Sequence, residues 1–317
     1  MMGWTPFPAT LAYLSLGLAS VACAPAHDAP SLYQALQDTD PEVRLDARDT
    51  IASLKAAGDY QVFARGLDSP SPLHKIQSIL YLAEMPQEGA SRTLRELLAR
   101  DRRLMLAFNP IRLKPSIEEH DSRIMVAHLI RSRGGDDKAL PTLLEGLDPS
   151  QDREVVVGTC FAVGALGDPG GIPFLASAAR SPEVAVARAA VQALGQFELG
   201  EILGALDEAL SHPAKEVRGD VLSSLAPSGD GPGLDLVLRV AGSDPEETLR
   251  LTAIERLSVA SDPTVTGFLI DLLDDESENI RRSVSQFLSR RTGQNFGEDH
   301  SRWSRWWSEQ SAGDPAC

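Results

Sequence analysis

The chain has 317 residues, with 45 acidic against 30 basic side chains and a formal net charge of −15. This charge argues against a general nucleic-acid binder, because such a protein needs a basic face to displace the counterions of the phosphate backbone. Aromatic residues make up only 5% of the sequence, which favours a thin helical core over strands with aromatic and β-branched alternation.

The chain begins with an apolar leader. The run from Ala9 to Ala22 has the length of a signal-peptide core and is too short to span a bilayer. Its end, LASVAC, resembles the lipobox of bacterial lipoproteins, which implies that Cys23 is lipidated and becomes the first residue of the mature chain. We expect a signal peptide over 1–22, a tether over 23–30 and a lipid-anchored protein of the bacterial periplasm or outer membrane. Ordinary cleavage followed by secretion is the alternative.

A helical repeat follows and accounts for residues 31–289. In the helix after Ser181, Val186 defines position 0 of a frame in which positions 0, 1, 4 and 8 lie on one buried stripe. Position 1 recurs eight times with a modal spacing of 31, at Arg44, Lys75, Arg123, Thr159, Ala187, Arg218, Arg250 and Arg281. Position 8 is always apolar and position 4 is never bulky. One helical hairpin cannot bury such a stripe, whereas stacked hairpins share a continuous core.

This pattern resembles the HEAT repeat family and its bacterial HEAT-like relatives, and GALGDPGGIPFL, from Gly164 to Leu175, is close to the link between two such repeats. The resemblance implies an all-α fold, an armadillo-like α-solenoid of about eight HEAT-like hairpins in one elongated domain. In the family, the basic residue at position 1 pairs with an acidic residue in a neighbouring turn. The candidate acidic partners here are Asp40, Asp148, Asp244 and Asp275. Thr159 and Ala187 depart from this charge pattern.

The third repeat carries an insertion around residues 91–117, because 48 residues separate Lys75 from Arg123. Basic side chains gather in it, including Arg95, Arg102, Arg103, Arg112 and Lys114. One interpretation is an extra solvated helix whose arginines pair with acidic neighbours. The other is a contact surface for an acidic partner or an anionic lipid, since insertions in repeat arrays map to loops on one face.

A search for catalytic or metal-binding residues is negative. Cys160 reads as a small residue packed inside a helix. The run Glu118 to Asp121 reads as the capped start of a helix, and the glycine-rich link from Gly164 to Gly171 reads as a helix end and turn. We expect no catalytic residues, metal or cofactor, and therefore no enzyme.

The C-terminal segment 290–310 resembles the closing segment of bacterial HEAT-like proteins, and 311–317 reads as a tail. Trp303, Trp306 and Trp307 lie at i, i+3 and i+4 on one helical face. We predict that they cover the exposed core of the last repeat, as terminal repeats must. A membrane-contacting aromatic patch is the alternative.

The strip opposite the buried stripe is the predicted binding surface, formed by positions 3 and 6 of the frame on the concave side of the solenoid. In the central repeats it carries Met125, His128, Phe161 and Gln192 and no charge. We expect a monomeric, non-enzymatic scaffold of the cell envelope that binds a protein partner there. The alternative for Met125 and Phe161 is a place in the core. The alternatives for function are a HEAT-like enzyme resembling the phycobilin lyases, or a purely structural envelope lipoprotein.

Overall fold

The structure is a computed structural model that describes residues 28–100, 104–106, 118–120, 122–145, 153–225 and 231–313. Its contacts divide into two compact units. The first unit contains α1 to α4, most of α5 and a pair of short strands, and the second contains α6 to α17. Among the described residues, no helix is both long enough and apolar enough to cross a membrane.

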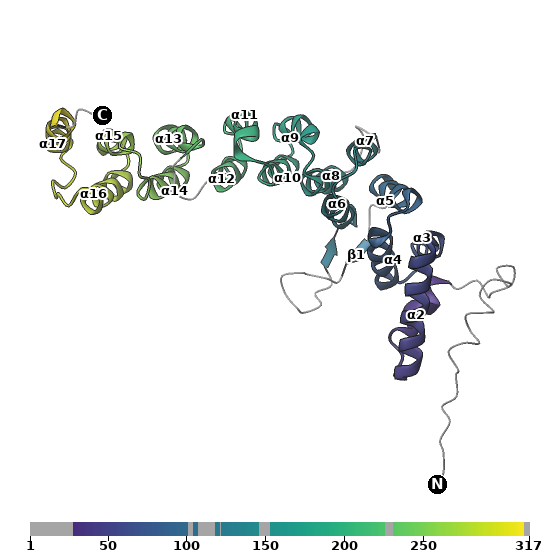
Figure 1. The fold of residues 1–317 in the computed structure, drawn as a ribbon. Coiled ribbons are helices and arrows are strands. Elements are labelled where there is room, and N and C mark those ends of the chain that lie inside the picture. Colours follow the sequence, from purple (N-terminus) through teal and green to yellow (C-terminus); the bar gives the residue numbers. More distant parts are fainter. Residues whose placement is uncertain are drawn as a thin grey trace, which may run out of the picture. The chain divides into compact units, whose positions relative to one another are not determined.

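Two and a half helical hairpins and a small β-hairpin form the first unit (Figure 1). The elements are α1 (Ala29–Ala35), α2 (Pro41–Ala57), α3 (Tyr60–Gly66), α4 (Pro72–Glu84), α5 (Glu88–Arg100), β1 (Leu104–Leu106) and β2 (Glu118–His120). Asp40 caps α2 by accepting the amide of Glu42 at 2.9 Å, and Pro41 occupies the first turn, as predicted. Tyr33 and Phe63 are fully buried, and the Tyr33 hydroxyl bonds the Ser78 hydroxyl at 3.0 Å.

The described part of the insertion contains both a helix and a strand. Residues 91–100 belong to α5, and Leu104–Leu106 pairs with Glu118–His120 as an antiparallel strand. The prediction that Glu118 to Asp121 open a helix is wrong, because Glu118–His120 are extended and α6 begins at Ser122. Backbone pairing with a distant segment decided the conformation of these residues, and no local periodicity encodes such a pairing.

The second unit has two layers of helices (Figure 1), with odd-numbered helices in one layer and even-numbered helices in the other. Its helices are α6 (Ser122–Ser132), α7 (Ala139–Glu145), α8 (Arg153–Leu166), α9 (Ile172–Ala178), α10 (Val184–Leu194), α11 (Leu199–Ala209), α12 (Lys215–Ser224), α13 (Leu234–Ser243), α14 (Glu247–Leu257), α15 (Thr264–Asp271), α16 (Glu278–Thr292) and α17 (His300–Gly313). Short 3₁₀ turns, η1 (Pro169–Gly171) and η2 (Leu272–Asp274), follow α8 and α15.

The repeat frame is confirmed at all eight copies, which lie on the even-numbered helices α2 to α16. Every residue at position 8 is at most 8% exposed: Ile51, Leu82, Ile130, Leu166, Leu194, Leu225, Leu257 and Leu288. Every residue at position 4 is at most 2% exposed: Ala47, Ser78, Val126, Ala162, Ala190, Val221, Ala253 and Val284. The all-α, solenoid-like fold predicted from the periodicity is therefore the observed fold.

The C-terminal helix α17 covers the end of the last repeat. Trp303 is fully buried, packs edge-on against Phe296 with ring centroids 4.9 Å apart, and donates its indole N–H to the Gly297 carbonyl at 2.9 Å. Trp307 lies against Gly267 of α15. The prediction of a cap is thus confirmed for Trp303, which belongs to the core and to no surface patch.

Candidate functional site

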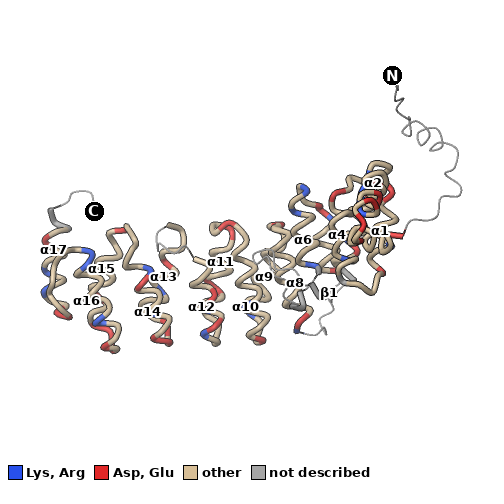
Figure 2. Tube along the Cα trace, turned by 90° about the horizontal axis from the view of Figure 1, so that it is seen from below, with Lys and Arg blue, Asp and Glu red and all other residues tan. Residues whose placement is uncertain are grey.

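The predicted binding strip lies on α6, α8 and α10, and we call it the even-helix face. It consists of the residues at frame positions 3 and 6 of these helices: Met125, His128, Phe161, Gly164, Ala189 and Gln192. His128 and Gln192 are exposed, and Met125 and Phe161 are half-buried. Figure 2 looks onto the even-numbered layer and shows long uncharged stretches along α8 and α10, whereas α14 and α16 carry charges of both signs.

Two members of the predicted strip are buried between helices instead. A Cβ added to Gly164 would lie 3.0 Å from both the Cβ and the carbonyl oxygen of Ala193. Ala189 is only 3% exposed. Small residues let α8 and α10 approach closely, which moves these two positions into the core. Met125 and Phe161 are intermediate between the two predicted outcomes, because each keeps part of its side chain at the surface.

A charged pair borders the even-helix face. Asp220 occupies frame position 3 of α12, whereas Arg188 lies at a frame position that the prediction did not use. Arg188, at position 2 of α10, bonds Asp220 of α12 with Nε–Oδ2 and Nη2–Oδ1 distances of 2.7 and 3.3 Å. The hydrogen bond and charge of Asp220 raise the pKa of the Arg188 guanidinium. The Gln192 amide donates to the same carboxylate at 3.3 Å. Gln192 therefore belongs to the charged border of the even-helix face. In the sequence, an arginine in one repeat and an aspartate in the next, Arg188 and Asp220, were the signal that could have predicted this pair.

An apolar stripe lies at the same frame angles on α4, within the first unit. Leu73 is 48% exposed and Leu80, at position 6, is 42% exposed. Gln77, at position 3 between them, is half-buried. Exposed leucines therefore occur at these frame angles outside the central repeats as well.

A ladder of buried ion pairs fixes the later repeats of the second unit. Arg218 grips Asp244 through Nε–Oδ2 and Nη2–Oδ1 bonds of 2.8 and 2.9 Å, with both side chains under 10% exposed. Arg250 bonds the Asp244 carbonyl at 3.0 Å and the Asp275 carboxylate at 3.3 Å. Arg281 then bonds the Asp275 carbonyl at 2.9 Å. The predicted pairing of position 1 with Asp244 and Asp275 is therefore confirmed.

At the predicted break, the hydrogen bonds described for Arg123 go to residues of α8. Arg123 donates to the hydroxyl of Thr159 at 2.9 Å and to the Val155 carbonyl at 3.1 Å. Ala187 is fully buried and packs between helices. Of the other two predicted acidic partners, Asp40 serves as a helix cap and Asp148 lies outside the described residues.

One of the basic residues predicted for the insertion can be placed. Arg95 is 8% exposed and pairs with Glu88 at 2.6 Å, which agrees with the interpretation that these arginines pair with acidic neighbours. Four more basic residues, and the predicted lipidation site, lie outside the described residues: Arg102, Arg103, Arg112, Lys114 and Cys23.

Two features of the described residues concern reactive and metal-binding side chains. Cys160 is fully buried, and burial raises the pKa of its thiol to about 12, which disfavours the reactive thiolate. Within the described ranges, no three His, Cys, Asp or Glu residues are grouped so that they could hold a metal ion.

Comparison with known proteins finds HEAT repeats in this chain. The family model for HEAT repeats matches residues 118–195, 140–226 and 172–258. No curated protein matches the sequence. Among solved structures, human deoxyhypusine hydroxylase in complex with glycerol is similar, with 19% identity over 84% of this chain and 96% of that chain and a TM-score of 0.33. The chain is a helical repeat scaffold.

Proposed function

We propose that this chain is a non-enzymatic interaction scaffold of the bacterial cell envelope and that it binds a protein partner through the even-helix face. The observation that carries the proposal is the half-buried pair Met125 and Phe161 on a face that lacks charge at its centre. HEAT repeats support it, since stacked repeats create extended binding surfaces.

The composition of the even-helix face fits a protein interface. Such interfaces place aromatic and methionine side chains at a centre depleted of charge and keep charged groups at a polar rim. Phe161 and Met125 supply the centre, and the Arg188–Asp220 pair lies at the border. The partner would place an apolar side chain against Phe161, because burial of an aromatic side chain contributes more than a solvated ion pair.

Partner capture by a Phe161→Asp variant tests this proposal. We expect binding of the partner, identified by cross-linking the unchanged chain, to fall at least tenfold, equivalent to about 1.4 kcal/mol. Thr252→Asp is the matched control, because Thr252 occupies the same frame position on α14 and is exposed. His128→Glu adds charge at an exposed position of the face and separates lost binding from lost folding. Equal binding by all four proteins would refute the even-helix face as the interface.

The envelope location rests on the leader and on the lipobox-like sequence that ends at Cys23. A lipid chain at this residue would hold the scaffold at a membrane surface. Cys23→Ser should move the protein from the membrane fraction to the soluble fraction of the cell, and an unchanged distribution would rule the anchor out.

Two measurements on the purified protein distinguish the scaffold from the other two functions, a HEAT-like enzyme and a purely structural lipoprotein. A bound chromophore or catalytic turnover would replace the scaffold by an enzyme of the HEAT-like class. Cross-linking that captures no specific partner would favour a purely structural lipoprotein.

A further inference from the structure

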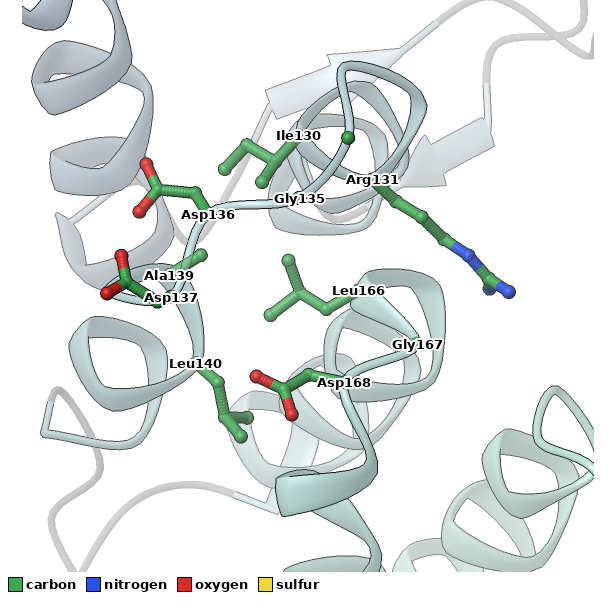
Figure 3. A pocket seen from close by; sticks show the side chains of 11 residues that line it. Ile130, Arg131, Gly135, Asp136, Asp137, Ala139, Leu140, Leu166, Gly167 and Asp168 are labelled. Carbon is green, nitrogen blue, oxygen red and sulfur yellow. The ribbon is translucent and has the colours of Figure 1, made fainter.

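A pocket of about 430 Å³ lies in the second unit, between the turn that joins α6 to α7 and the end of α8 (Figure 3). Its floor is apolar, since Ile130, Leu140 and Leu166 line it and each is at most 8% exposed. Figure 3 shows the Asp168 carboxylate between Leu140 and Leu166. The pocket therefore combines an aliphatic surface with an acid.

The charge of the lining is negative. Among the described residues that line it, three are acidic (Asp136, Asp137 and Asp168) and one is basic (Arg131), which gives these residues a net charge of −2. The Arg131 guanidinium lies over Gly167 on the far side of the α8 end and points away from the carboxylates (Figure 3). Asp136 and Asp168 each use one oxygen to cap the following turn, at 3.0 Å from the Lys138 amide and 2.9 Å from the Gly170 amide.

The corresponding groove near the C-terminus is filled by an arginine of the chain itself. Arg291, at the end of α16, reaches into the turn that joins α14 to α15. Its Nε donates to the Thr266 hydroxyl at 2.8 Å, its Nη2 donates to the Asp262 carbonyl at 3.0 Å, and its Nη1 donates to the Ala260 carbonyl. A guanidinium is therefore the group that this type of groove accommodates within the same molecule.

The two grooves correspond residue by residue. Asp136 and Asp262 each accept the amide two residues later and offer their carbonyl to the amide three residues later. Leu140 stands four residues after Asp136, as Thr266 stands four residues after Asp262. On the opposite wall, three residues after the buried leucine at position 8, α16 has Arg291 whereas the end of α8 has Pro169. As far as the described residues show, the earlier groove thus has the same backbone arrangement without an arginine in it.

We infer that the pocket between the α6–α7 turn and the end of α8 binds an arginine side chain of a protein partner. The methylene groups would lie on Ile130, Leu140 and Leu166, and the guanidinium would take the place that Arg291 takes in its own groove. Asp168 supplies a charged acceptor that replaces the Thr266 hydroxyl, and charged acceptors make the stronger hydrogen bonds with arginine. This site is separate from the even-helix face and does not depend on it.

The test uses N-acetyl-L-arginine amide as the probe and its neutral isostere N-acetyl-L-citrulline amide as the control. Amide NMR spectra of the full chain report on Gly134, Gly135 and Gly167, which line the pocket. We expect saturable shifts of these signals with the arginine probe and at least tenfold weaker binding of the citrulline probe. Equal binding of the two probes would overturn the inference.

Two variants locate the binding. The double variant Asp137→Asn, Asp168→Asn should weaken arginine binding at least tenfold, while an asparagine at residue 168 can still cap the next turn. Pro169→Arg should place an arginine of the chain where Arg291 lies in the other groove, and thereby abolish probe binding and raise the melting temperature. Asp262→Asn, in the filled groove, is the matched control and should leave binding unchanged. Unchanged binding in both pocket variants, or a structure with the Arg131 guanidinium in the pocket, would overturn the inference.

Discussion

Replacing Asp244 with alanine should strongly destabilise the second unit. Its carboxylate is 4% exposed and accepts two hydrogen bonds from Arg218, at 2.8 and 2.9 Å, and one from the Glu246 amide at 2.9 Å. Alanine removes all three acceptors and leaves the Arg218 guanidinium buried with only the His212 and Pro213 carbonyls, each at 3.0 Å. The cost therefore comes mainly from an uncompensated buried charge.

The expected size follows from this geometry. Breaking one side of a buried pair costs about 3–5 kcal/mol, and one kilocalorie lowers the melting temperature of a unit of this length by about 2–4 °C. The loss is therefore about 6–20 °C. Asp220→Ala is the matched control, because its partner Arg188 is 44% exposed and stays solvated when the carboxylate is removed, although Asp220 itself is 15% exposed. An ion pair whose cation remains in contact with solvent contributes about 1 kcal/mol or less, so the control should shift the melting temperature by at most about 4 °C.

Lowering the pH should reproduce part of the stability loss expected for Asp244→Ala, because it protonates the Asp244 carboxylate. Burial alone would raise the pKa of Asp244, but the hydrogen bonds from Arg218 and the Glu246 amide outweigh it and leave the pKa below its usual value of 3.8. A depressed pKa means that the pair contributes its full stability above about pH 4 and loses it as the pH falls through the folded-state value. The difference between the unchanged chain and Asp244→Asn, which does not titrate, should accordingly shrink in acid.

Thermal unfolding followed by far-ultraviolet circular dichroism, at several pH values from about 3 to 7, measures both effects. Similar losses for the Asp244 and Asp220 variants would refute the reasoning, because burial would then not distinguish the two ion pairs. A constant difference between the unchanged chain and Asp244→Asn across this range would refute the role assigned to the carboxylate charge.

Three further variants or measurements probe the packing. Gly164→Ala should destabilise by about 1–3 kcal/mol in thermal unfolding because its methyl would crowd Ala193, whereas Gly204→Ala, with open space around it, should be neutral or slightly stabilising; equal effects would contradict the close helix approach. Trp303→Ala should cost about 3–5 kcal/mol by emptying a fully buried site in the C-terminal cap, and an unchanged melting temperature would contradict a capping role. Cys160 should resist alkylation at about pH 8 until the chain unfolds, since burial raises its thiol pKa to about 12; peptide mapping by mass spectrometry after iodoacetamide treatment measures this, and rapid native labelling would show that the thiol is accessible.

The repeat itself could be predicted from the sequence. Positions 4 and 8 of the frame fall on the same face of each helix, so the sequence of every copy predicts the same buried stripe. The buried leucines from Leu82 to Leu288 are therefore where periodicity places them. The pairing of Arg218 and Arg250 with Asp244 and Asp275 was also predictable, because a fixed spacing in sequence becomes a fixed distance once the repeats stack.

The candidate binding surface was predictable only in part. The periodicity correctly placed His128 and Gln192 at the surface, but it also placed Gly164 and Ala189 there. Those two are buried because α8 and α10 approach until small residues touch, and the distance between two helices depends on both of them together. A helical frame gives the direction of a side chain around the axis of its own helix. It gives no information about the distance to the adjacent helix.

What the sequence determined by itself is the class of fold, the number of repeat copies and the residues of the shared core, because these follow from local periodicity. Only the tertiary structure decided which grooves between repeats are filled. Arg291 and Pro169 hold equivalent places in their repeats, yet one groove contains a guanidinium and the other is open. That difference arises where a turn, a helix end and a side chain from separate stretches of the chain meet, so no single segment of the sequence encodes it.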